Sequence, residues 1–287
     1  PATLRRQRQM CIRDRWYCDR TGIKRKDMRK DSTTVSRTRN EVTRLDRTRI
    51  AMWSGPRNIS TALMYSFENR FDCHATDEPL YASFLLNSGS PHPAAEEVIE
   101  KNETDVEKII TTLTGPIPNE KHIWYQKHMC HHIPEDSDIS WIDDFKNCFL
   151  IRNPRDVLLS LSKITDSIDL LSTGLPQQLT IFRHVIRSSG KIPPVIDSAD
   201  VLEDPESILS VLCESIGIPF SRRMLSWEPG PRSCDGLWGK YWYDSVWKSS
   251  GFSSPSSKEE ELSDHLHSVL EESTVIYQEL RKMRIRT

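Results

Sequence analysis

Two short runs of this 287-residue chain combine residue types that bind anions. The first run is Met52-Trp53-Ser54-Gly55-Pro56-Arg57-Asn58-Ile59-Ser60-Thr61, in which an apolar stretch meets a tight turn and then an amphipathic segment. Free backbone N–H groups at a helix start attract anions, and Ser60 and Thr61 add hydroxyl donors. Arg57 adds a planar cation suited to phosphate or sulfate oxygens. A plain strand–turn–helix with Ser60 as N-cap is the alternative interpretation.

The second run is Phe149-Leu150-Ile151-Arg152-Asn153-Pro154-Arg155-Asp156-Val157-Leu158-Leu159-Ser160. Again an apolar strand leads into a helix, with Pro154 in the first turn, where its missing N–H costs little. Arg152 ends the strand, at the edge where open α/β sheets bind ligands. Ser160, two turns into the helix, could reach the same anion, whereas Arg155 and Asp156 alone fit a solvated face.

Taken together, the two runs resemble the P-loop-like sulfotransferases, which use 3′-phosphoadenosine 5′-phosphosulfate. Residues 56–61 are similar to their 5′-phosphosulfate loop, with Asn58-Ile59 in place of Ser-Gly, and residues 152–160 are similar to their 3′-phosphate segment. The resemblance assigns two sets of ligands: for the 5′ side Arg57, Asn58, Ser60 and Thr61, and for the 3′-phosphate Arg152 and Ser160. The first run lacks the Gly-Lys-Ser/Thr ending of a nucleoside-triphosphate loop, which argues against an ordinary kinase.

Glu78 is a candidate general base, because it belongs to the run Asp77-Glu78-Pro79, which directly follows a short strand at residues 73–76. A carboxylate there would face the sulfate of the donor, and partial burial would raise its pKa toward a useful range. Several branches of the sulfotransferases use a Glu in this region. The alternative is a purely electrostatic role for Glu78 at a helix N-terminus.

A second catalytic candidate is the cluster Lys127-His128-Met129-Cys130-His131-His132. It resembles the Lys-Thr-His segment of cytosolic sulfotransferases, which implies that Lys127 contacts the transferring sulfate. The histidine base of that segment would fall between His128, one residue early, and His131, two residues late. A loop of hydrogen-bonded histidines and a zinc site remain alternatives, although no fourth zinc ligand is evident.

Aromatic, Gly and Pro residues are dense between residues 225 and 252. Such a loop could stack an adenine or close over an acceptor, and packing alone is the competing interpretation. The resemblance makes Lys248 and Gly251 loose analogues of a C-terminal loop that helps to bind the 3′-phosphate.

The elements that must position these residues are short apolar strands alternating with helices. Strands are predicted at 50–53, 73–76, 122–126, 148–151 and 195–197. Helices are predicted at 60–67, 80–86, 93–101, 103–113, 154–164, 177–188, 198–202, 205–216 and 257–283. This order predicts an α/β fold with a parallel central sheet flanked by helices. The resemblance narrows it to the P-loop NTPase-like sulfotransferase fold.

Charge divides the chain into two regions. The net charge is −2, yet residues 1–50 hold 16 basic against 6 acidic residues, and the rest holds 23 against 35. Residues 1–47 lack apolar periodicity, so a disordered basic arm is predicted. Residues 9–15 resemble translated sequencing-adaptor read-through, so the arm need not be native, and no nucleic-acid partner is inferred from it. Residues 48–287 are predicted to form one sulfotransferase-like domain with a C-terminal helix.

Several classes of protein are disfavoured by composition. No run approaches the roughly 18 apolar residues of a membrane span, and no secretory signal is visible. The seven cysteines are scattered without a Cys-x-x-Cys pair, which favours reduced thiols in a cytoplasmic protein over disulfides or structural zinc. Residues 49–255 resemble a bacterial-type sulfotransferase-like family in which aminotransferase names occur, but no lysine context suits pyridoxal phosphate.

The sequence therefore predicts an enzyme that moves a sulfuryl group from 3′-phosphoadenosine 5′-phosphosulfate to a hydroxyl or amine, without a metal. A small-molecule acceptor is expected, and Glu78, His128 or His131 would be the base. A divergent P-loop phosphotransferase and a catalytically inactive nucleotide-binding scaffold are the alternatives. No acceptor and no oligomeric state are predicted, because loops shape acceptor pockets.

Overall fold

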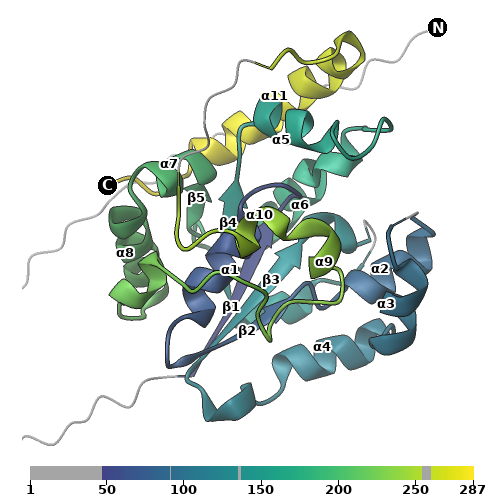
Figure 1. The fold of residues 1–287 in the computed structure, drawn as a ribbon. Coiled ribbons are helices and arrows are strands. Elements are labelled where there is room, and N and C mark those ends of the chain that lie inside the picture. Colours follow the sequence, from purple (N-terminus) through teal and green to yellow (C-terminus); the bar gives the residue numbers. More distant parts are fainter. Residues whose placement is uncertain (1–46, 91, 135–136, 254–259) are drawn as a thin grey trace, which may run out of the picture. The chain divides into compact units, whose positions relative to one another are not determined.

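A five-stranded parallel sheet organises the protein, with strand order β2-β3-β1-β4-β5 (Figure 1). The computed structural model describes residues 47–90, 92–134, 137–253 and 260–287. The strands are β1 Thr48–Ser54, β2 Cys73–Asp77, β3 Ile123–Met129, β4 Lys146–Ile151 and β5 Val195–Asp197. The sequence prediction of a parallel sheet flanked by helices is confirmed. The predicted basic arm lies outside the described residues, apart from Arg47.

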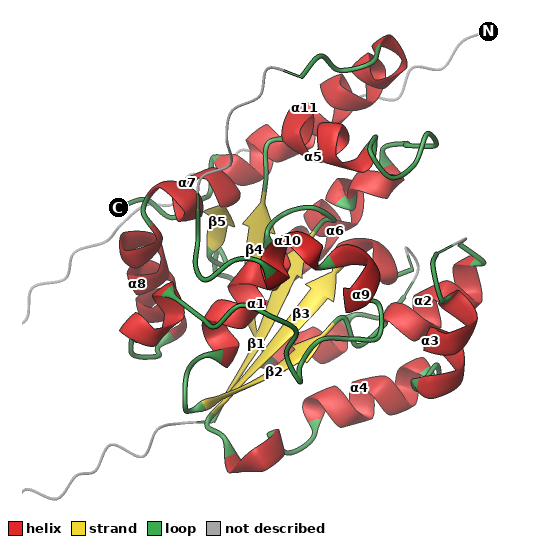
Figure 2. Ribbon diagram, viewed as in Figure 1, coloured by secondary structure: helices red, strands yellow, loops and turns green. Residues whose placement is uncertain are grey.

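Helices connect the strands and pack on both faces of the sheet (Figure 2). The α-helices are α1 Ser60–Glu68, α2 Tyr81–Ser88, α3 Ala95–Lys101, α4 Val106–Thr114, α5 Pro154–Leu161, α6 Leu175–Ser189, α7 Ser198–Glu203, α8 Pro205–Ile216, α9 Gly239–Trp242, α10 Asp244–Trp247 and α11 His267–Arg281. Short 3-10 helices are η1 Pro118–Glu120, η2 Cys130–His132, η3 Ser140–Asp144, η4 Leu171–Thr173, η5 Arg222–Leu225 and η6 Asp264–Leu266.

Alternation along the strands gives the sheet two separate cores. On β1, Ile50 and Met52 are buried with α1 and α8, whereas Ala51 and Trp53 are buried with α4, α6 and α11. Successive side chains of a strand point to opposite faces, so the apolar residues 50–53 of this strand serve both cores. A third apolar cluster joins α2 and α3 to Trp238 and Tyr243.

Several predicted boundaries differ from the structure, and three of them bear on the site or on the C-terminal helix. The predicted strand at 122–126 extends to Met129, because residues 127 and 128 are buried within the sheet and pair with β1. The helix predicted to reach residue 164 ends at Leu161. The C-terminal helix begins at His267 instead of residue 257, after the 3-10 turn η6, and residues 254–259 lie outside the described part.

The edge strand β5 is partly covered by the segment that follows α11. The Ile285 N–H donates to the Val195 carbonyl at 2.9 Å, and Arg284 forms a parallel bridge with Val195. Across the described residues, no helix is long and apolar enough to cross a membrane.

Candidate active site

The loop between β1 and α1 lies at the carboxyl end of the central strand, as the sequence predicts for an anion site. It turns sharply, with Arg57 at φ 63° and Ile59 at φ 58°, both in the left-handed region. A Cβ built on Gly55 would lie only 2.3 Å from the Thr173 carbonyl oxygen, so a side chain cannot fit there. Because α1 begins at Ser60 without a side-chain cap, its first N–H groups stay available for an anion.

Asn58 fastens this loop to the sheet. Its Nδ2 donates to the Leu150 carbonyl at 3.3 Å, and its own carbonyl accepts from Ser198 Oγ at 3.2 Å. The side chain is 3% exposed, so its visible function is to shape the loop. Direct contact of Asn58 with a co-substrate remains a prediction.

Two guanidinium groups converge beside the loop. Arg57 Nε donates to Ser160 Oγ at 2.8 Å, and Arg152 donates to the Arg57 carbonyl at 2.6 Å. The two predicted anion-binding runs therefore meet in space. Burial lowers the pKa of both arginines, and the charge of Arg152 lowers that of Arg57 further. Within the described chain Arg57 has no ion pair, while Arg152 approaches Asp156 only to 3.8 Å.

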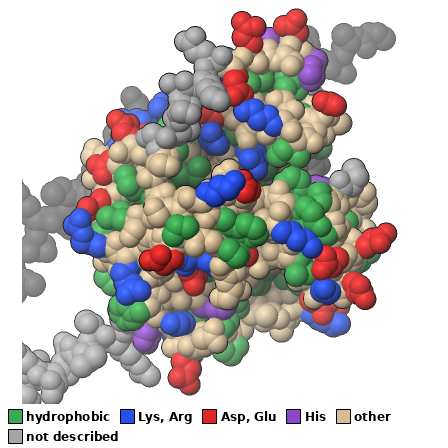
Figure 3. All heavy atoms as spheres, in the orientation of Figure 1, with side chains coloured by type: hydrophobic (Ala, Val, Ile, Leu, Met, Phe, Trp, Pro, Cys, Tyr) green, Lys and Arg blue, Asp and Glu red, His purple; other side chains and the backbone are tan. Residues whose placement is uncertain are grey.

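The outer surface offers a contrast to this concentration of charge. On the face that carries α9 and α10, basic and acidic side chains are interspersed among hydrophobic ones (Figure 3). Positive charge is thus not a general property of that face.

Lys127 lies at the centre of a buried polar network. Its Nζ donates to Asp77 Oδ1 at 2.8 Å, to Glu78 Oε1 at 2.6 Å and to the Tyr243 hydroxyl at 2.8 Å. Burial alone would lower the pKa of Lys127, but the two carboxylates outweigh it and raise that pKa. An ammonium group has three donors, and all three are occupied.

Tyr243 connects this network to the segment after α8. Its hydroxyl donates to Asp77 Oδ2 at 2.7 Å and accepts from Trp238 Nε1 at 3.0 Å. Trp247 Nε1, in the same segment, donates to the hydroxyl of Tyr65 in α1 at 3.0 Å. The aromatic segment therefore joins the carboxyl end of β2 to α1.

Glu78 has the features of a general base. It follows β2 with φ 40°, and its side chain is 12% exposed. Burial raises the pKa of its carboxyl group, although the Lys127 charge opposes this shift. A strained backbone at such a position is common in functional sites. The second oxygen, Oε2, lies 3.9 Å from His132 Nε2.

The three histidines after Lys127 occupy different environments. His128 points to the face opposite Lys127, stacks on Trp53 with ring centroids 4.5 Å apart, and has a pKa that burial lowers to about 3. His131 packs beside Phe84, and burial lowers its pKa to about 4. His132 stacks on Phe84 as well. The predicted catalytic roles of His128 and His131 remain predictions, and His132 is the histidine closest to Glu78.

The two predicted residues of the C-terminal loop lie beyond α10. Lys248 is exposed and pairs with Asp244 at 2.7 Å, whereas Gly251 bridges to Ser226. Gly251 permits this close pairing, since a Cβ there would lie 2.9 Å from the Leu225 carbonyl oxygen. Their binding of a 3′-phosphate is still a prediction.

Sequence reasoning missed Asp77 and Tyr243 as parts of the site. Asp77 precedes Glu78 directly, so a second carboxylate at the same strand end was a usable signal. Tyr243 had no such signal, because only tertiary packing brings it to β2. In the described ranges, no group of three His, Cys, Asp or Glu side chains is placed to hold a metal ion.

A parallel α/β sheet with a cationic loop at its carboxyl edge, next to a buried Lys–carboxylate network, defines a class of protein that handles anionic groups. Comparison with known families identifies the family within this class. The profile described as "Sulfotransferase domain" matches residues 48–284, and the chain belongs to this family.

Two curated relatives come from Arabidopsis thaliana. Branched-chain-amino-acid aminotransferase-like protein 2 is 37% identical over 232 residues, and the like-named protein 1 is 36% identical over 236 residues. Each alignment covers 81% of this chain and 41% of the relative, so the chain spans about two fifths of their length.

Solved structures give weaker overall likenesses. The sulfotransferase from Alicyclobacillus acidocaldarius has a TM-score of 0.46 at 12% identity, covering 84% of this chain and 97% of its own. The sulfotransferase domain from the curacin biosynthetic pathway has a TM-score of 0.43 at 14% identity, covering 83% and 92%.

Proposed function

We propose that this chain transfers a sulfuryl group from 3′-phosphoadenosine 5′-phosphosulfate to the hydroxyl or amine of a small acceptor. Membership of the sulfotransferase domain family supports the reaction class. The observation that carries the proposal is the convergence of Arg57 and Arg152, for which the described residues supply one carboxylate, Asp156, at 3.8 Å from Arg152. Two like charges held together in a partly buried site are stabilised when an anion binds between them.

The 5′ end of the donor would bind at the loop of residues 55–61. There the open N-terminus of α1 and the hydroxyls of Ser60 and Thr61 offer donors to the phosphosulfate. Arg152 and Ser160 would take the 3′-phosphate. The donor thus spans the two runs that Arg57 already joins through its bond to Ser160.

In the transfer step, the acceptor oxygen or nitrogen attacks the sulfur atom. The new bond to sulfur forms as the bond from sulfur to the bridging phosphate oxygen breaks, and the leaving electrons stay on adenosine 3′,5′-bisphosphate. Glu78 Oε2, the oxygen that Lys127 does not bond, takes the acceptor's proton. Positioning and electrostatic stabilisation supply most of the rate in transfers of this kind.

Lys127 acts in this proposal through Glu78 and not by direct contact with sulfate. Its three donors are already occupied, and its charge favours the ionised form of Glu78. It is therefore a positioning residue, whereas the resemblance of sequence suggested contact with the sulfate.

Calorimetry with adenosine 3′,5′-bisphosphate in metal-free buffer tests the proposed co-substrate. We expect binding by the unmodified chain and a loss of at least about 100-fold in affinity for Arg152→Ala, the scale of a lost charge-assisted bidentate contact. Arg155→Ala is the matched control, because Arg155 is exposed and its side chain donates, within the described residues, only to the Glu260 carbonyl. It should bind like the unmodified chain.

Other outcomes distinguish the alternatives. A preference for Mg-ATP over the bisphosphate would favour a phosphotransferase and reject the proposal. Tight bisphosphate binding without turnover of the donor on any acceptor would favour the nucleotide-binding scaffold.

A further inference from the structure

Gln178 is a polar residue on the buried face of α6. Its neighbours on this face are apolar and recur at helical spacing: Leu175, Ile181, Phe182 and Val185. The Gln178 side chain lies in the same stripe and is 0% exposed. Burying an amide costs free energy unless hydrogen bonds replace those to water, so the partners of this amide indicate what it does.

The Gln178 amide holds together the ends of two neighbouring strands. Its Nε2 donates to the Trp53 carbonyl of β1 at 3.0 Å and to the Leu150 carbonyl of β4 at 2.9 Å. The pairing of these strands ends at Ser54 and Leu150, so the amide lies where β1 and β4 separate. An amide nitrogen has two hydrogens, and this bridge uses both of them.

The two bridged carbonyls lie shortly before the two arginines of the anion site. Three residues separate Trp53 from Arg57, and one residue separates Leu150 from Arg152. The Arg152 guanidinium in turn donates to the Arg57 carbonyl at 2.6 Å. A shift between the two strand ends would therefore change the distance between the proposed 5′ and 3′ phosphate positions.

The start of α6 also contacts the anion loop itself. A Cβ built on Gly174 would lie 3.2 Å from Gly55 Cα, so backbone packs directly on backbone here. The apolar side chains of α6 pack with Trp53 and Phe149 in the core on this face of the sheet. Because closely packed interiors transmit small displacements, α6 fixes the position of both anion-binding runs.

We propose that Gln178 is a positioning residue, which keeps the two phosphate sites at the separation that a 3′,5′-bisphosphorylated adenosine requires. In line with the proposed function, on which this role rests, Gln178 acts through the strand ends before Arg57 and Arg152 and does not contact the co-substrate. A ligand that occupies both sites gains from their linkage only if their spacing matches its own. A ligand that occupies one site does not depend on that spacing.

Calorimetry with three nucleotides tests this role: adenosine 3′,5′-bisphosphate and the 5′- and 3′-monophosphates of adenosine, each of which carries one of its two phosphates. We expect the unmodified chain to bind the bisphosphate more tightly than either monophosphate. In Gln178→Met, whose side chain has a similar length but no N–H, this preference should fall at least about 10-fold. Each monophosphate should bind about as tightly as before, which a general loss of structure would not allow.

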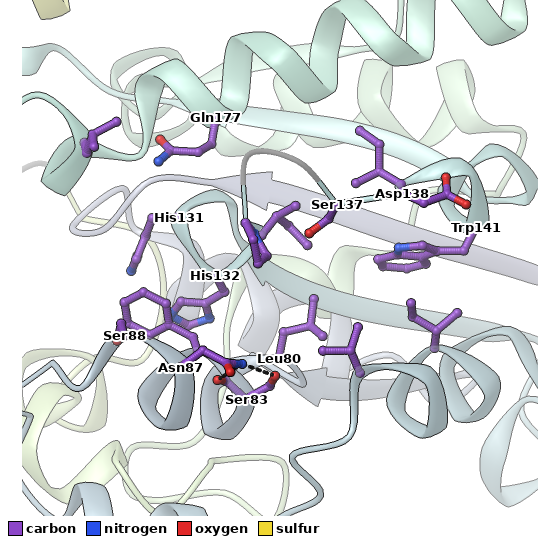
Figure 4. A pocket seen from close by; sticks show the side chains of 17 residues that line it. Leu80, Ser83, Asn87, Ser88, His131, His132, Ser137, Asp138, Trp141 and Gln177 are labelled. Carbon is purple, nitrogen blue, oxygen red and sulfur yellow. Dashed lines mark hydrogen bonds between the residues drawn. The ribbon is translucent and has the colours of Figure 1, made fainter.

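Gln177→Met is the matched control on the same helix. Gln177 lines a cavity of about 310 Å³ between α2, α4, η3 and the start of α6 (Figure 4). Its Oε1 has no hydrogen-bond partner within the described residues, and its amide takes no part in the bridge between β1 and β4. This variant should keep the full preference for the bisphosphate.

Gln178→Glu is a second variant that decides the matter if Gln178→Met does not fold. The new carboxyl group has nearly the shape of the amide, and burial keeps it protonated. It offers one hydrogen where the amide offers two, so it can hold only one strand end. The preference for the bisphosphate should fall at least about 3-fold. Urea unfolding shows whether each variant is folded.

Failure of this role and failure of the proposed function give different results. If the unmodified chain binds the bisphosphate no more tightly than the monophosphates, the proposed co-substrate is rejected, and the role of Gln178 with it. If the unmodified chain shows the preference and the folded Gln178 variants keep it, only the positioning role is overturned. Equal weakening of all three nucleotides in the Gln178 variants, or a lost preference in Gln177→Met, would overturn it as well.

Discussion

Ile59 holds a backbone conformation that β-branched residues rarely adopt. Its φ of 58° and ψ of 17° are left-handed, at the position where the resembling sulfotransferases have glycine. The geometry of a glycine loop is therefore kept without the glycine. Contacts of the Ile59 side chain with the core between the sheet and α1 offset part of the strain.

The Ile59 strain predicts an unusual order of stabilities. Ile59→Ala loses side-chain packing but keeps the strain, whereas Ile59→Gly loses packing and relieves it. We expect the glycine variant to be more stable than the alanine variant by about 1 kcal/mol, measured by urea unfolding. Equal stabilities, or a more stable alanine variant, would contradict the assigned strain.

Glu78 is expected to dominate turnover. Glu78→Gln should lower kcat at least about 100-fold while bisphosphate binding survives, because the amide cannot accept the acceptor's proton. Glu97→Gln is the control, since Glu97 lies in a surface ion pair with Lys101. Normal turnover by the Glu78→Gln variant would transfer the role of base to His131 or His132.

The pH profile tests Glu78 independently. A base must be ionised, and burial raises the pKa of Glu78 above its ordinary value. Turnover should therefore fall as the pH drops through a value higher than the roughly 4.3 of a free glutamate. An acid limb at or below the ordinary carboxyl range would show that another group titrates.

At the scale of elements, Tyr243 joins the aromatic segment of residues 227–247 to the ends of β2 and β3. Tyr243→Phe leaves the donors of Lys127 and Trp238 without this buried partner. We expect a loss of about 2 kcal/mol in the free energy of unfolding, with a smaller fall in turnover than for Glu78→Gln. Tyr241→Phe, at an exposed position of α9, should change neither quantity.

The helices and strands also show which parts of the fold and of the site could be predicted from the sequence alone. The strand–helix alternation predicted the parallel sheet, whereas the resemblance assigned Arg57 and Arg152 to opposite ends of one co-substrate and did not predict that the two side chains converge. The sequence predicts the end of β3 at residue 126, because Lys127 and His128 are polar. In the fold both side chains are buried, and contacts with distant residues offset the cost of burying them. Tyr243 and the cavity walls come from distant segments, and their proximity is fixed only by tertiary packing.

At the scale of the whole molecule, buried neutral histidines should make folding sensitive to acid. In the unfolded chain His128 titrates near pH 6.5, but in the fold burial lowers its pKa to about 3. Because the unfolded state binds the proton first, stability present at neutral pH is lost as the pH falls from about 6.5 toward 3. Between pH 7 and pH 5 this single group accounts for about 2 kcal/mol.

His128→Phe measures that contribution, because the substituted ring can still stack on Trp53. Urea unfolding at pH 7 and at pH 5 should show a pH-dependent loss about 2 kcal/mol smaller than in the unmodified chain. An unchanged difference would mean that His128 is protonated in the fold.

The covered edge of β5 has a consequence for association between molecules. Residues 284–285 occupy hydrogen-bonding positions along Val195 that an unprotected edge strand would offer to a neighbouring chain. The segment after α11 thus acts as a guard against intermolecular strand pairing. If this segment detached, the edge of β5 would be free to pair with a strand of another molecule, while the carboxyl-edge site would stay intact. Aggregation would then precede any loss of the site.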